Sequence, residues 1–267
     1  TASIGVALFI PQTTAVTATT VTSAANPAVA PSGSSSATVS YTVRVSPAAA
    51  NGTVVLRDNG AQIGTCDLVR TDNVSGTCTV SAALSVGSHP ITVTYPGKGD
   101  ATSGTFNPST SATLAQTVIA PTTTTITSSQ APSRYYQPVT FTASVTSGDG
   151  TTPTGTVTFS DGTTFLGRCT LGEAGGPANA CTWPIASLAV GTRTINAFYS
   201  GDATHQASPV GSFSQVVGKA NVSLAVASLG ATVYRQTATF RVTATPEFAG
   251  GIPTGLVSVS DGSTHLG

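Results

Sequence analysis

The sequence predicts an all-β protein built from tandem β-sandwich domains of about 100 residues each. Three observations support this fold class. A segment that begins Pro153-Thr154-Gly155 returns at Pro253, and an earlier copy begins at Asn51. Alternating apolar and hydroxyl residues, which are typical of strands, dominate the chain. No segment predicts a helix longer than one turn. The repeat is too long for a solenoid but matches a sandwich module.

Strands are predicted in the same order within each copy. The first half of a copy contains an alternating run such as 139–145, then a Gly-Thr-Val run such as 155–157. An Asp-Gly step at 161–162 follows and predicts a hairpin turn, because these residues tolerate positive φ. The second half contains a run such as 187–199 and a closing strand near 212–217.

Short joints divide the chain into four parts. We expect residues 1–10 to be the closing strand of a preceding module or a donor strand, and 11–118 to form a first domain (repeat 1). Residues 119–217 should form a second domain (repeat 2), and 218–267 part of a third (the third segment). Joints of a few residues, some with proline, favour an elongated, semi-rigid rod over a flexible string.

Composition argues against several classes of function. Charged residues make up 7 % of the chain, with 10 basic and 10 acidic side chains and a formal net charge of zero. Nucleic-acid binding needs a basic surface, so we expect no nucleic-acid partner. No stretch reaches the roughly 18 apolar residues of a membrane span. A neutral surface has little self-repulsion, so association between copies is not opposed.

The four cysteines form two matching pairs. Cys66 and Cys78 lie 12 residues apart, and so do Cys169 and Cys181 in the next copy. One pair at the same two positions of each copy indicates a disulfide within each domain. A metal site would instead call for closely spaced cysteines with histidine partners. Repeated structural disulfides imply an extracellular or cell-surface location.

Two motifs resemble a known family. They are P-T-G-T-V-T-F-x-D-G-T-x-x-L-G at 153–167 and S-L-A-V-G-T-x-T-I-x-A-x-Y-S-G-D-A at 187–203. Together they resemble the bacterial immunoglobulin-like repeats of large surface and secreted proteins. The resemblance implies tandem immunoglobulin-like sandwiches used as a stalk, spacer or adhesion module, with no shared catalytic residues. Within this plan we place the two cysteines of each copy on neighbouring strands.

No candidate catalytic set recurs between the copies. His89, His205 and His265 fall at different repeat positions, which favours surface loops or strands over a shared catalytic or metal site. Asp58, Asp161 and Asp261 share one position, but it directly precedes a turn, where Asp commonly bonds to the backbone. One carboxylate per copy is too few for calcium. We therefore predict no enzyme, no metal and no cofactor.

Aromatic residues offer one binding hypothesis. Tyr135, Tyr136, Tyr234, Trp183 and Phe198 could form a platform on which sugars stack. The alternative is that they pack in the fold. We favour the second interpretation for Phe198, which lies on a predicted core strand, and for Trp183, which follows a cysteine by two residues.

The two ends of the chain suggest a hypothesis about assembly. An apolar run containing Ile4, Val6, Leu8 and Ile10 resembles a closing strand, while residues 218–267 contain only the first half of a copy. One copy's first strand could therefore complete the last module of another. The alternative is that the sequence is a window of a longer array.

The sequence thus predicts a non-enzymatic structural protein of the bacterial cell surface or extracellular matrix. Its repeats would form a rod or filament that acts in self-assembly or adhesion. Its expected partners are other copies of itself and, less directly, surface glycans. Two alternatives stay open: a spacer or accessory module of a larger secreted enzyme, and a carbohydrate-binding module.

Overall fold

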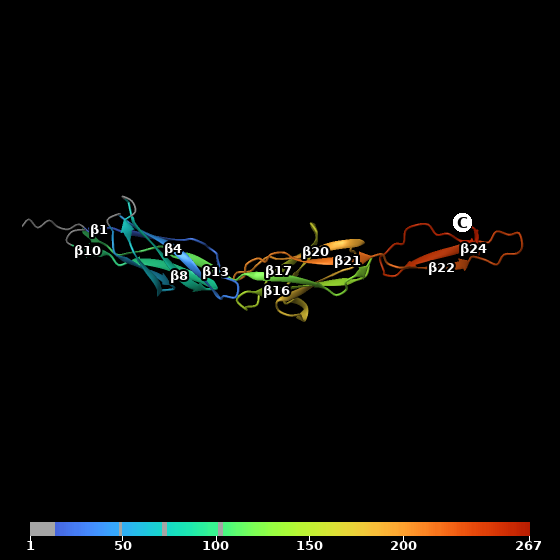
Figure 1. Cartoon of the computed structure of the whole chain (residues 1–267), viewed down its shortest axis with the longest axis horizontal. Coiled ribbons are helices and arrows are strands. Elements are labelled where there is room, and N and C mark those ends of the chain that lie inside the picture. Colours follow the sequence, from blue (N-terminus) through green and yellow to red (C-terminus); the bar gives the residue numbers. More distant parts are fainter. Residues whose placement is uncertain (1–13, 48–49, 71–73, 101–103) are drawn as a thin grey trace, which may run out of the picture. The chain divides into compact units, whose positions relative to one another are not determined.

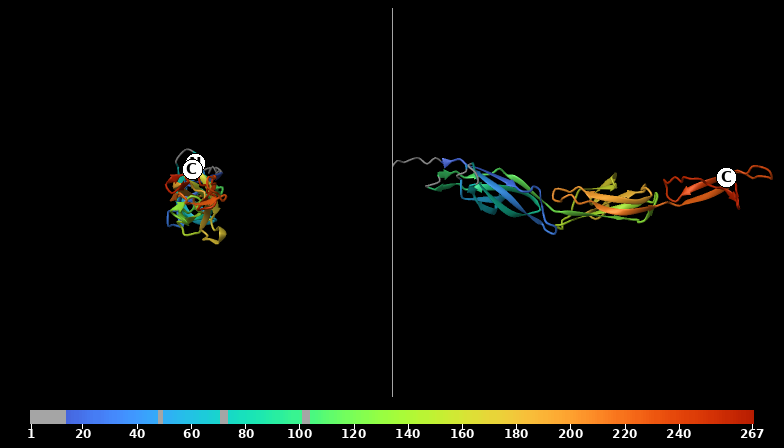
Figure 2. Two further views of the ribbon diagram at one scale, coloured as in Figure 1. Left: turned by 90° about the vertical axis from the view of Figure 1, so that its right-hand side faces the viewer. Right: turned by 45° about the horizontal axis from the view of Figure 1, so that its top comes forward.

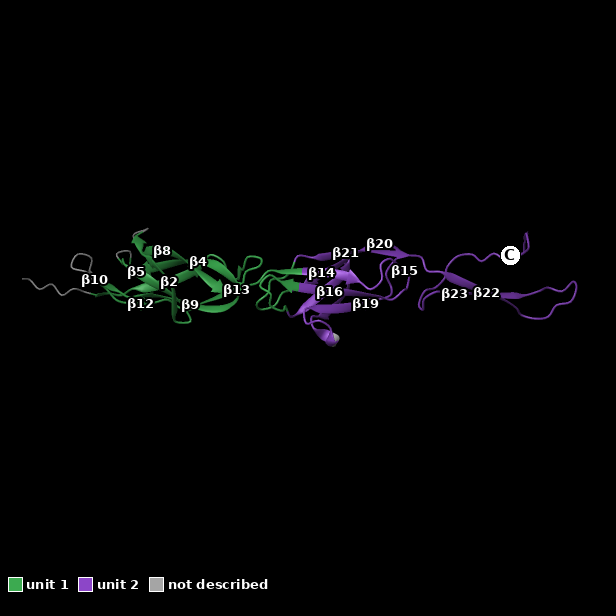
Figure 3. Cartoon of the chain, turned by 60° about the horizontal axis from the view of Figure 1, so that its bottom comes forward, with its two compact units in different colours: residues 1–123, 146–153, 201–208 green, residues 124–145, 154–200, 209–267 purple. Residues whose placement is uncertain are grey.

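The computed structural model describes residues 14–47, 50–70, 74–100 and 104–267 (Figure 1). Among these residues the regular structure is β-strand, apart from the single 3-10 turn Glu173–Gly175 (Figure 2). Two compact units are present (Figure 3): Thr1–Thr123 with Thr146–Pro153 and Gly201–Ser208, and Thr124–Val145 with Thr154–Ser200 and Pro209–Gly267.

Repeat 1 is a sandwich of two main sheets. Its strands are Thr14–Ala15 (β1), Ala18–Ser23 (β2), Ala28–Val29 (β3), Ser36–Ser46 (β4), Thr53–Asp58 (β5), Ala61–Asp67 (β6), Val69–Arg70 (β7), Gly76–Ser85 (β8), Gly87–Tyr95 (β9), Lys98–Asp100 (β10), Gly104–Phe106 (β11), Ser109–Thr110 (β12) and Leu114–Ile119 (β13). One sheet has the order β2-β4-β8-β7, and the other has the order β3-β13-β9-β5-β6, with β12 on β9. A small sheet, β1-β11-β10, completes the repeat.

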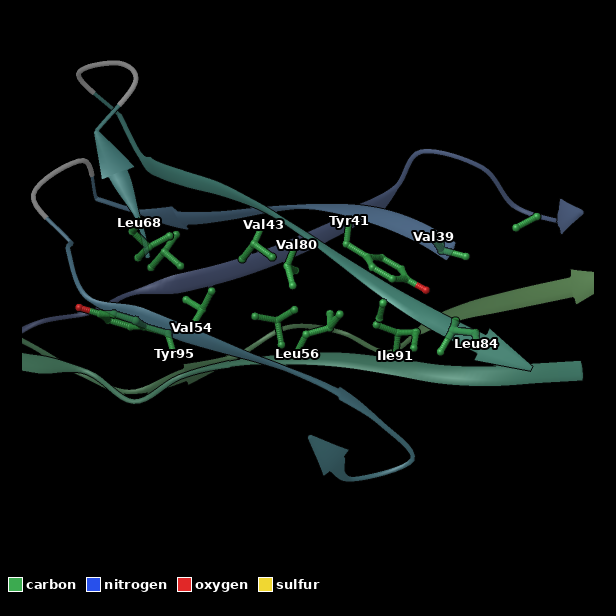
Figure 4. Close-up of a cluster of buried hydrophobic side chains, with 14 of the residues drawn as sticks. Val39, Tyr41, Val43, Val54, Leu56, Leu68, Val80, Leu84, Ile91 and Tyr95 are labelled. Carbon is green, nitrogen blue, oxygen red and sulfur yellow. The ribbon is translucent and has the colours of Figure 1, made fainter. Parts of the chain in front are cut away.

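The core of repeat 1 follows from the alternation of its strands. Every second residue of β4 from Ala37 to Val45 is buried, as the period-two pattern predicts. Figure 4 shows Tyr41 and Val80 of one sheet facing Leu56 and Ile91 of the other. Each such aliphatic side chain contributes about 1.5–3 kcal/mol when it is fully buried.

Repeat 2 has the same plan with fewer strands. They are Thr122–Ser128 (β14), Ser133–Arg134 (β15), Val139–Ser147 (β16), Thr156–Asp161 (β17), Thr164–Thr170 (β18), Ala180–Ile185 (β19), Gly191–Tyr199 (β20) and Gly211–Gly218 (β21). The sheets have the orders β14-β16-β19 and β15-β21-β20-β17-β18. Phe141 and Phe159 are fully buried between them.

A buried tyrosine ends the same strand in both repeats. Tyr95 closes β9 and Tyr199 closes β20, and both side chains are fully buried. Their hydroxyls donate hydrogen bonds to the carbonyls of Asn51 (3.0 Å) and Thr154 (2.7 Å). Each ring therefore fills the core while its polar atom stays satisfied.

The predicted hairpins are present. β5 and β6 join through Asn59 and Gly60, which have φ values of 46° and 84°. β17 and β18 join through Gly162, whose φ is 57°. Positive φ is the backbone conformation that these residue types adopt at low cost, so the turn prediction from the Asp-Asn-Gly and Asp-Gly steps is confirmed.

The third segment contains Val222–Ser228 (β22), Phe240–Pro246 (β23), Ser260–Asp261 (β24) and Thr264–His265 (β25). β22 pairs with β23, and β24 with β25. Phe240 and Val257 are 48 % and 44 % exposed, whereas their counterparts Phe141 and Val157 in repeat 2 are fully buried. In repeat 2 the equivalent residues form β17, which lies between β18 and β20. In the third segment the residues just before Ser260 are not a strand, and no described strand takes the place of β20.

We expect Leu56→Ala to destabilise repeat 1 by about 2–5 kcal/mol, because Leu56 is buried and its loss leaves a cavity. Val69→Ala is the matched control: Val69 is 63 % exposed, so its effect should stay within about 0.5 kcal/mol. Urea unfolding measures both. Equal effects of the two variants would contradict the assignment of the core.

Candidate functional site

The two disulfides join sheets rather than hydrogen-bonded neighbours. Cys66 of β6 is bonded to Cys78 of β8, and Cys169 of β18 to Cys181 of β19. In each repeat these strands belong to different sheets. The expectation of neighbouring strands holds only in the sense that the strands meet along one side of the sandwich. The bridges therefore close that side of each repeat.

A glycine next to each bridge allows the sheets to approach. Gly64 lies two residues before Cys66, and Gly167 lies two residues before Cys169. The two glycines therefore occupy the same position of the repeat. A Cβ atom on Gly64 would lie 2.7 Å from Val80 Cγ2, and one on Gly167 would lie 2.1 Å from the Trp183 ring. Any side chain at these positions would push the opposite strand away. Trp183 is therefore a packing residue, as expected.

The in-phase aspartates contact a basic side chain as well as a turn. Asp58 Oδ2 lies 2.7 Å from His89 Nδ1, and His89 Nε2 lies 2.8 Å from the carbonyl oxygen of Ser85. In repeat 2 the Nε of Arg193 donates to Asp161 Oδ2 at 2.7 Å, and a terminal nitrogen lies 2.6 Å away. His89 and Arg193 occupy the same repeat position. Histidine positions alone do not reveal this shared position, because repeat 2 has arginine there.

The two repeats also differ at the position of Tyr41, close to Asp58. Its hydroxyl is fully buried and has no hydrogen-bond partner among the described residues, and neither has Asp58 Oδ1. Burial, helped by the charge of Asp58, raises the pKa of Tyr41 to about 12. Repeat 2 has Phe141 at the equivalent position, two residues before the residue paired with the second cysteine of the bridge. Of the two repeats, only the one with histidine beside its hairpin aspartate has this buried tyrosine hydroxyl.

His205 is the centre of a buried polar cluster. Its Nδ1 lies 2.9 Å from both carboxylate oxygens of Asp202, and its Nε2 lies 2.7 Å from Thr151 Oγ1. Asp149 Oδ1 lies 4.0 Å from Nε2. The backbone N–H groups of Thr204 and His205 donate to Asp202 Oδ1 at 2.8 Å, so Asp202 caps its own loop.

The His205 cluster fixes the start of repeat 2. Ala120 forms a parallel bridge with His205, and its carbonyl accepts a hydrogen bond from Gln206 N–H at 2.8 Å. In repeat 1 Ala15 pairs in the same way with Phe106. One repeat thus buries a phenyl ring where the other buries an imidazole. The expectation of surface histidines is wrong for His89 and His205, which are 9 % and 4 % exposed.

The aromatic residues do not form one platform. Tyr135 and Tyr136 stack edge to face with ring centroids 4.6 Å apart, and the Tyr136 ring lies against Gly250. Tyr234 is highly exposed and carries Arg235 over its ring. Phe198 lies on β20 as predicted but faces outward and is 42 % exposed, so the expectation of a core position is wrong.

Hydroxyl groups cover the outer faces of the sheets that contain β4 and β16. On repeat 1 Thr42 is paired with Thr79, and Ser40 with Ser81, whose hydroxyls are 2.7 Å apart. On repeat 2 Thr142 is paired with Thr182. These faces can donate and accept hydrogen bonds but carry little charge.

The described residues include no cluster of three or more His, Cys, Asp or Glu side chains that could hold a metal ion. Within the same ranges there is no helix with the length and hydrophobicity that crossing a membrane requires. The assembly residues Ile4, Val6, Leu8 and Ile10 lie outside the described residues, so that hypothesis stays a prediction.

The family model for the bacterial Ig-like domain (group 3) matches residues 10–119 and 126–218. This chain belongs to the bacterial Ig-like domain family. The two matches coincide with the two disulfide-bonded sandwiches of these Ig-like repeats. No curated protein matches the chain.

Three solved structures with low sequence identity resemble the Ig-like repeats. The fibronectin(III)-like modules of Clostridium thermocellum CbhA are 14 % identical, with 76 % of this chain and 95 % of that chain covered and a TM-score of 0.38. The ectodomain of mouse nectin-like molecule 4 is 15 % identical, with coverages of 80 % and 66 % and a TM-score of 0.30. The BSP domain of a biofilm-associated protein is 18 % identical, with coverages of 74 % and 29 % and a TM-score of 0.26.

We expect repeat 2 to depend on the charge of Arg193. Arg193→Gln leaves Asp161 without its ion pair and should cost about 1–2 kcal/mol, since the pair is partly exposed. His89→Arg is the matched control, because it places at Asp58 the cation that repeat 2 already uses. Urea unfolding should find this control at or near wild-type stability. A loss as large as that of Arg193→Gln would show that the two positions are not equivalent.

Acid should weaken the His205 cluster. Burial raises the pKa of Asp149, but hydrogen bonds from Ser147 and Thr151 and the charge of His205 outweigh it, so the pKa lies below its ordinary value. A lowered pKa means that the folded state prefers the carboxylate. Its stabilising contribution is therefore present at neutral pH and is lost as pH falls below about 4.

Asp149→Asn removes this titration, so its stability should change less between pH 7 and pH 3 than that of the wild-type chain. Thermal unfolding at the two pH values measures the difference. Identical pH dependence of the two proteins would contradict the assignment.

Proposed function

We propose that this chain is a non-enzymatic structural part of a bacterial cell surface or extracellular matrix. Its Ig-like repeats would form an elongated rod or filament that acts in self-assembly or adhesion. One observation carries the proposal: the groups that recur in phase in both repeats all serve the fold. They are the disulfide, the close-approach glycine, the buried tyrosine and the pair of an aspartate with a basic side chain.

Surface chemistry supports self-association. The chain has a formal net charge of zero, so copies do not repel each other strongly. The hydroxyl rows of the two sandwiches offer hydrogen-bonding faces, and Phe165 and Phe198 add exposed aromatic groups to the five-stranded sheet of repeat 2. Aromatic side chains are enriched in protein interfaces. Other copies of the chain are therefore the partners that we propose first.

The disulfides support an extracellular or cell-surface location. Such bonds persist in oxidising compartments and are rare where thiols are kept reduced. Both repeats carry one at the same position. A spacer of a larger secreted enzyme would share this location, and it stays the second candidate.

Sedimentation velocity over a concentration series, with negative-stain images, tests the proposal. We expect association that increases with concentration, and particles longer than one copy. Phe165→Ser with Phe198→Ser should weaken association, whereas Val16→Ser, which alters an exposed residue of repeat 1, should not. A chain that stays monomeric at every concentration and does not bind bacterial cells would overturn the proposal.

A glycan array tests the remaining alternative, that the chain is a carbohydrate-binding module. Glycan binding that is lost in Tyr135→Ala with Tyr136→Ala would favour a carbohydrate-binding module over self-assembly. Hydrolase activity of this chain, abolished by one substitution, would contradict the non-enzymatic assignment.

A further inference from the structure

Two of the three histidines are buried, and the proposed function uses neither of them. His89 is 9 % exposed and His205 is 4 % exposed, whereas His265 lies on an exposed strand of the third segment. A buried charge is costly unless it is paired and hydrogen-bonded. The partners of the two buried rings therefore determine which protons these rings can carry.

Both ring nitrogens of His89 face acceptors. Nδ1 lies 2.7 Å from Asp58 Oδ2, and Nε2 lies 2.8 Å from the carbonyl oxygen of Ser85. Carbonyl and carboxylate oxygens only accept hydrogen bonds, and a neutral imidazole has a single N–H to donate. The two contacts thus require one proton more than a neutral ring and a carboxylate hold together. Imidazole is the stronger base of the two groups, so we assign this proton to the ring.

The ring of His205 reaches the same result through a hydroxyl group. Its Nδ1 lies 2.9 Å from both carboxylate oxygens of Asp202, so Nδ1 donates. Its Nε2 lies 2.7 Å from Thr151 Oγ1, and Thr151 donates its only hydroxyl proton to Asp149 Oδ1 at 2.7 Å. Towards the ring this hydroxyl can only accept, so Nε2 donates as well. The lowered pKa of Asp149 agrees with this direction, because an ionised carboxylate accepts.

The titratable groups that face His89 come from two strands. Asp58 belongs to β5, and Tyr41 of β4 interacts with the same carboxylate. The pKa of Tyr41 is about 12, so its hydroxyl adds no charge near neutral pH. On the other side β13 places the uncharged Gln116 opposite His89. The carboxylate of Asp58 is therefore the charge that stabilises a protonated ring here.

Two carboxylates surround His205. Asp202 belongs to its own loop, and Asp149, in the loop after β16, has Oδ1 4.0 Å from Nε2. The residue that pairs with His205 in the bridge is the uncharged Ala120. Two negative groups around one buried ring favour the positively charged form of that ring.

The loop that carries His205 holds the first residues of repeat 2. Ala120 N–H donates to the carbonyl of Thr204, and Gln206 N–H donates to the carbonyl of Ala120, both at 2.8 Å. His205 lies between these two bonds. A neutral ring could not donate to its carboxylate and its hydroxyl partner together, so one buried contact would be lost. The bonds on either side would then be weaker.

We propose that His89 and His205 are imidazolium ions at neutral pH, and that loss of these ring protons to solvent as pH rises loosens the hairpin of repeat 1 and the start of repeat 2. Histidines of an unfolded chain lose their protons near about pH 6.5. Below this pH both states hold the protons, so the stabilisation is fully present. Above it the folded state binds more protons than the unfolded state, and the unfolding equilibrium constant rises about tenfold per pH unit for each retained proton.

NMR of the full wild-type chain with isotope-labelled histidine nitrogens tests the proposal at pH 7.5. The nitrogens of an imidazolium ring and the bare nitrogen of a neutral ring resonate in separate regions of the spectrum. We expect both nitrogens of His89 and His205 to carry protons. An exposed imidazole is mostly neutral at this pH, so His265 serves as the reference. His205→Phe removes one set of signals and assigns the others.

His89→Arg separates a titrating charge from a permanent one. Arginine keeps its proton at every pH of interest, and Arg193 already occupies this position in repeat 2. Between pH 6.5 and pH 8.5 the unfolding equilibrium constant of the variant, measured by urea unfolding, should therefore rise less than that of the wild-type chain. The expected difference is up to about tenfold per pH unit.

Hydrogen exchange of single amides reports on the other site without a variant. The protection of the Ala120 and Gln206 amides should fall with rising pH by up to about tenfold per pH unit, after correction for the intrinsic exchange rate. In repeat 1 Asn107 N–H donates to the carbonyl of Ala15 at 3.0 Å, beside a phenyl ring, and provides the matched control. Its protection should not depend on pH in this range.

Three results would overturn the proposal. They are a bare ring nitrogen in either buried histidine at pH 7.5, the same pH dependence for His89→Arg and the wild-type chain, and pH-independent protection of the Ala120 and Gln206 amides. Each measurement is made on single molecules of the chain in solution. A chain that neither self-associates nor adheres would therefore refute the proposed function and leave this inference unaffected.

Discussion

The disulfide and the glycine two residues before it set the geometry of both complete repeats. Gly64 and Gly167 let the sheets approach along one side of the sandwich, and the Cys66–Cys78 and Cys169–Cys181 bonds hold them there. β6 and β18 are edge strands, which are otherwise open to pairing with other chains. Because one side is fixed, the packed core can be filled with Val, Leu and aromatic side chains from both sheets.

The repeats differ where the same physical requirement has two solutions. An aspartate at the hairpin contacts a basic side chain, which is His89 in one repeat and Arg193 in the other. The start of each repeat needs a buried ring, which is Phe106 or His205. The imidazole requires acidic and hydroxyl partners that the phenyl ring does not, so Asp202 and Thr151 accompany it. The two repeats therefore share the same arrangement of strands and contacts, although different residue types make some of those contacts.

A structural role follows naturally from such an architecture. Outer faces rich in hydroxyls can meet other surfaces without strong repulsion, while the parallel terminal strands connect each sandwich to the chain on both sides. The proposed assembly uses the outside of the sandwich. It depends on the fold as a whole, so it requires no pocket with special chemistry.

The sequence by itself determined the strand pattern, the hairpin turns, the pairing of the cysteines and the family, because these depend on local spacing and on an internal repeat. It did not reveal that the bridges join two sheets, that Asp58 meets His89, or that Gln116 and Gln215 donate hydrogen bonds to the carbonyls of Ala25 and Gln130. Those contacts join residues far apart in the chain. Alternation shows which side chains face inward, but only the tertiary structure decides which of them meet.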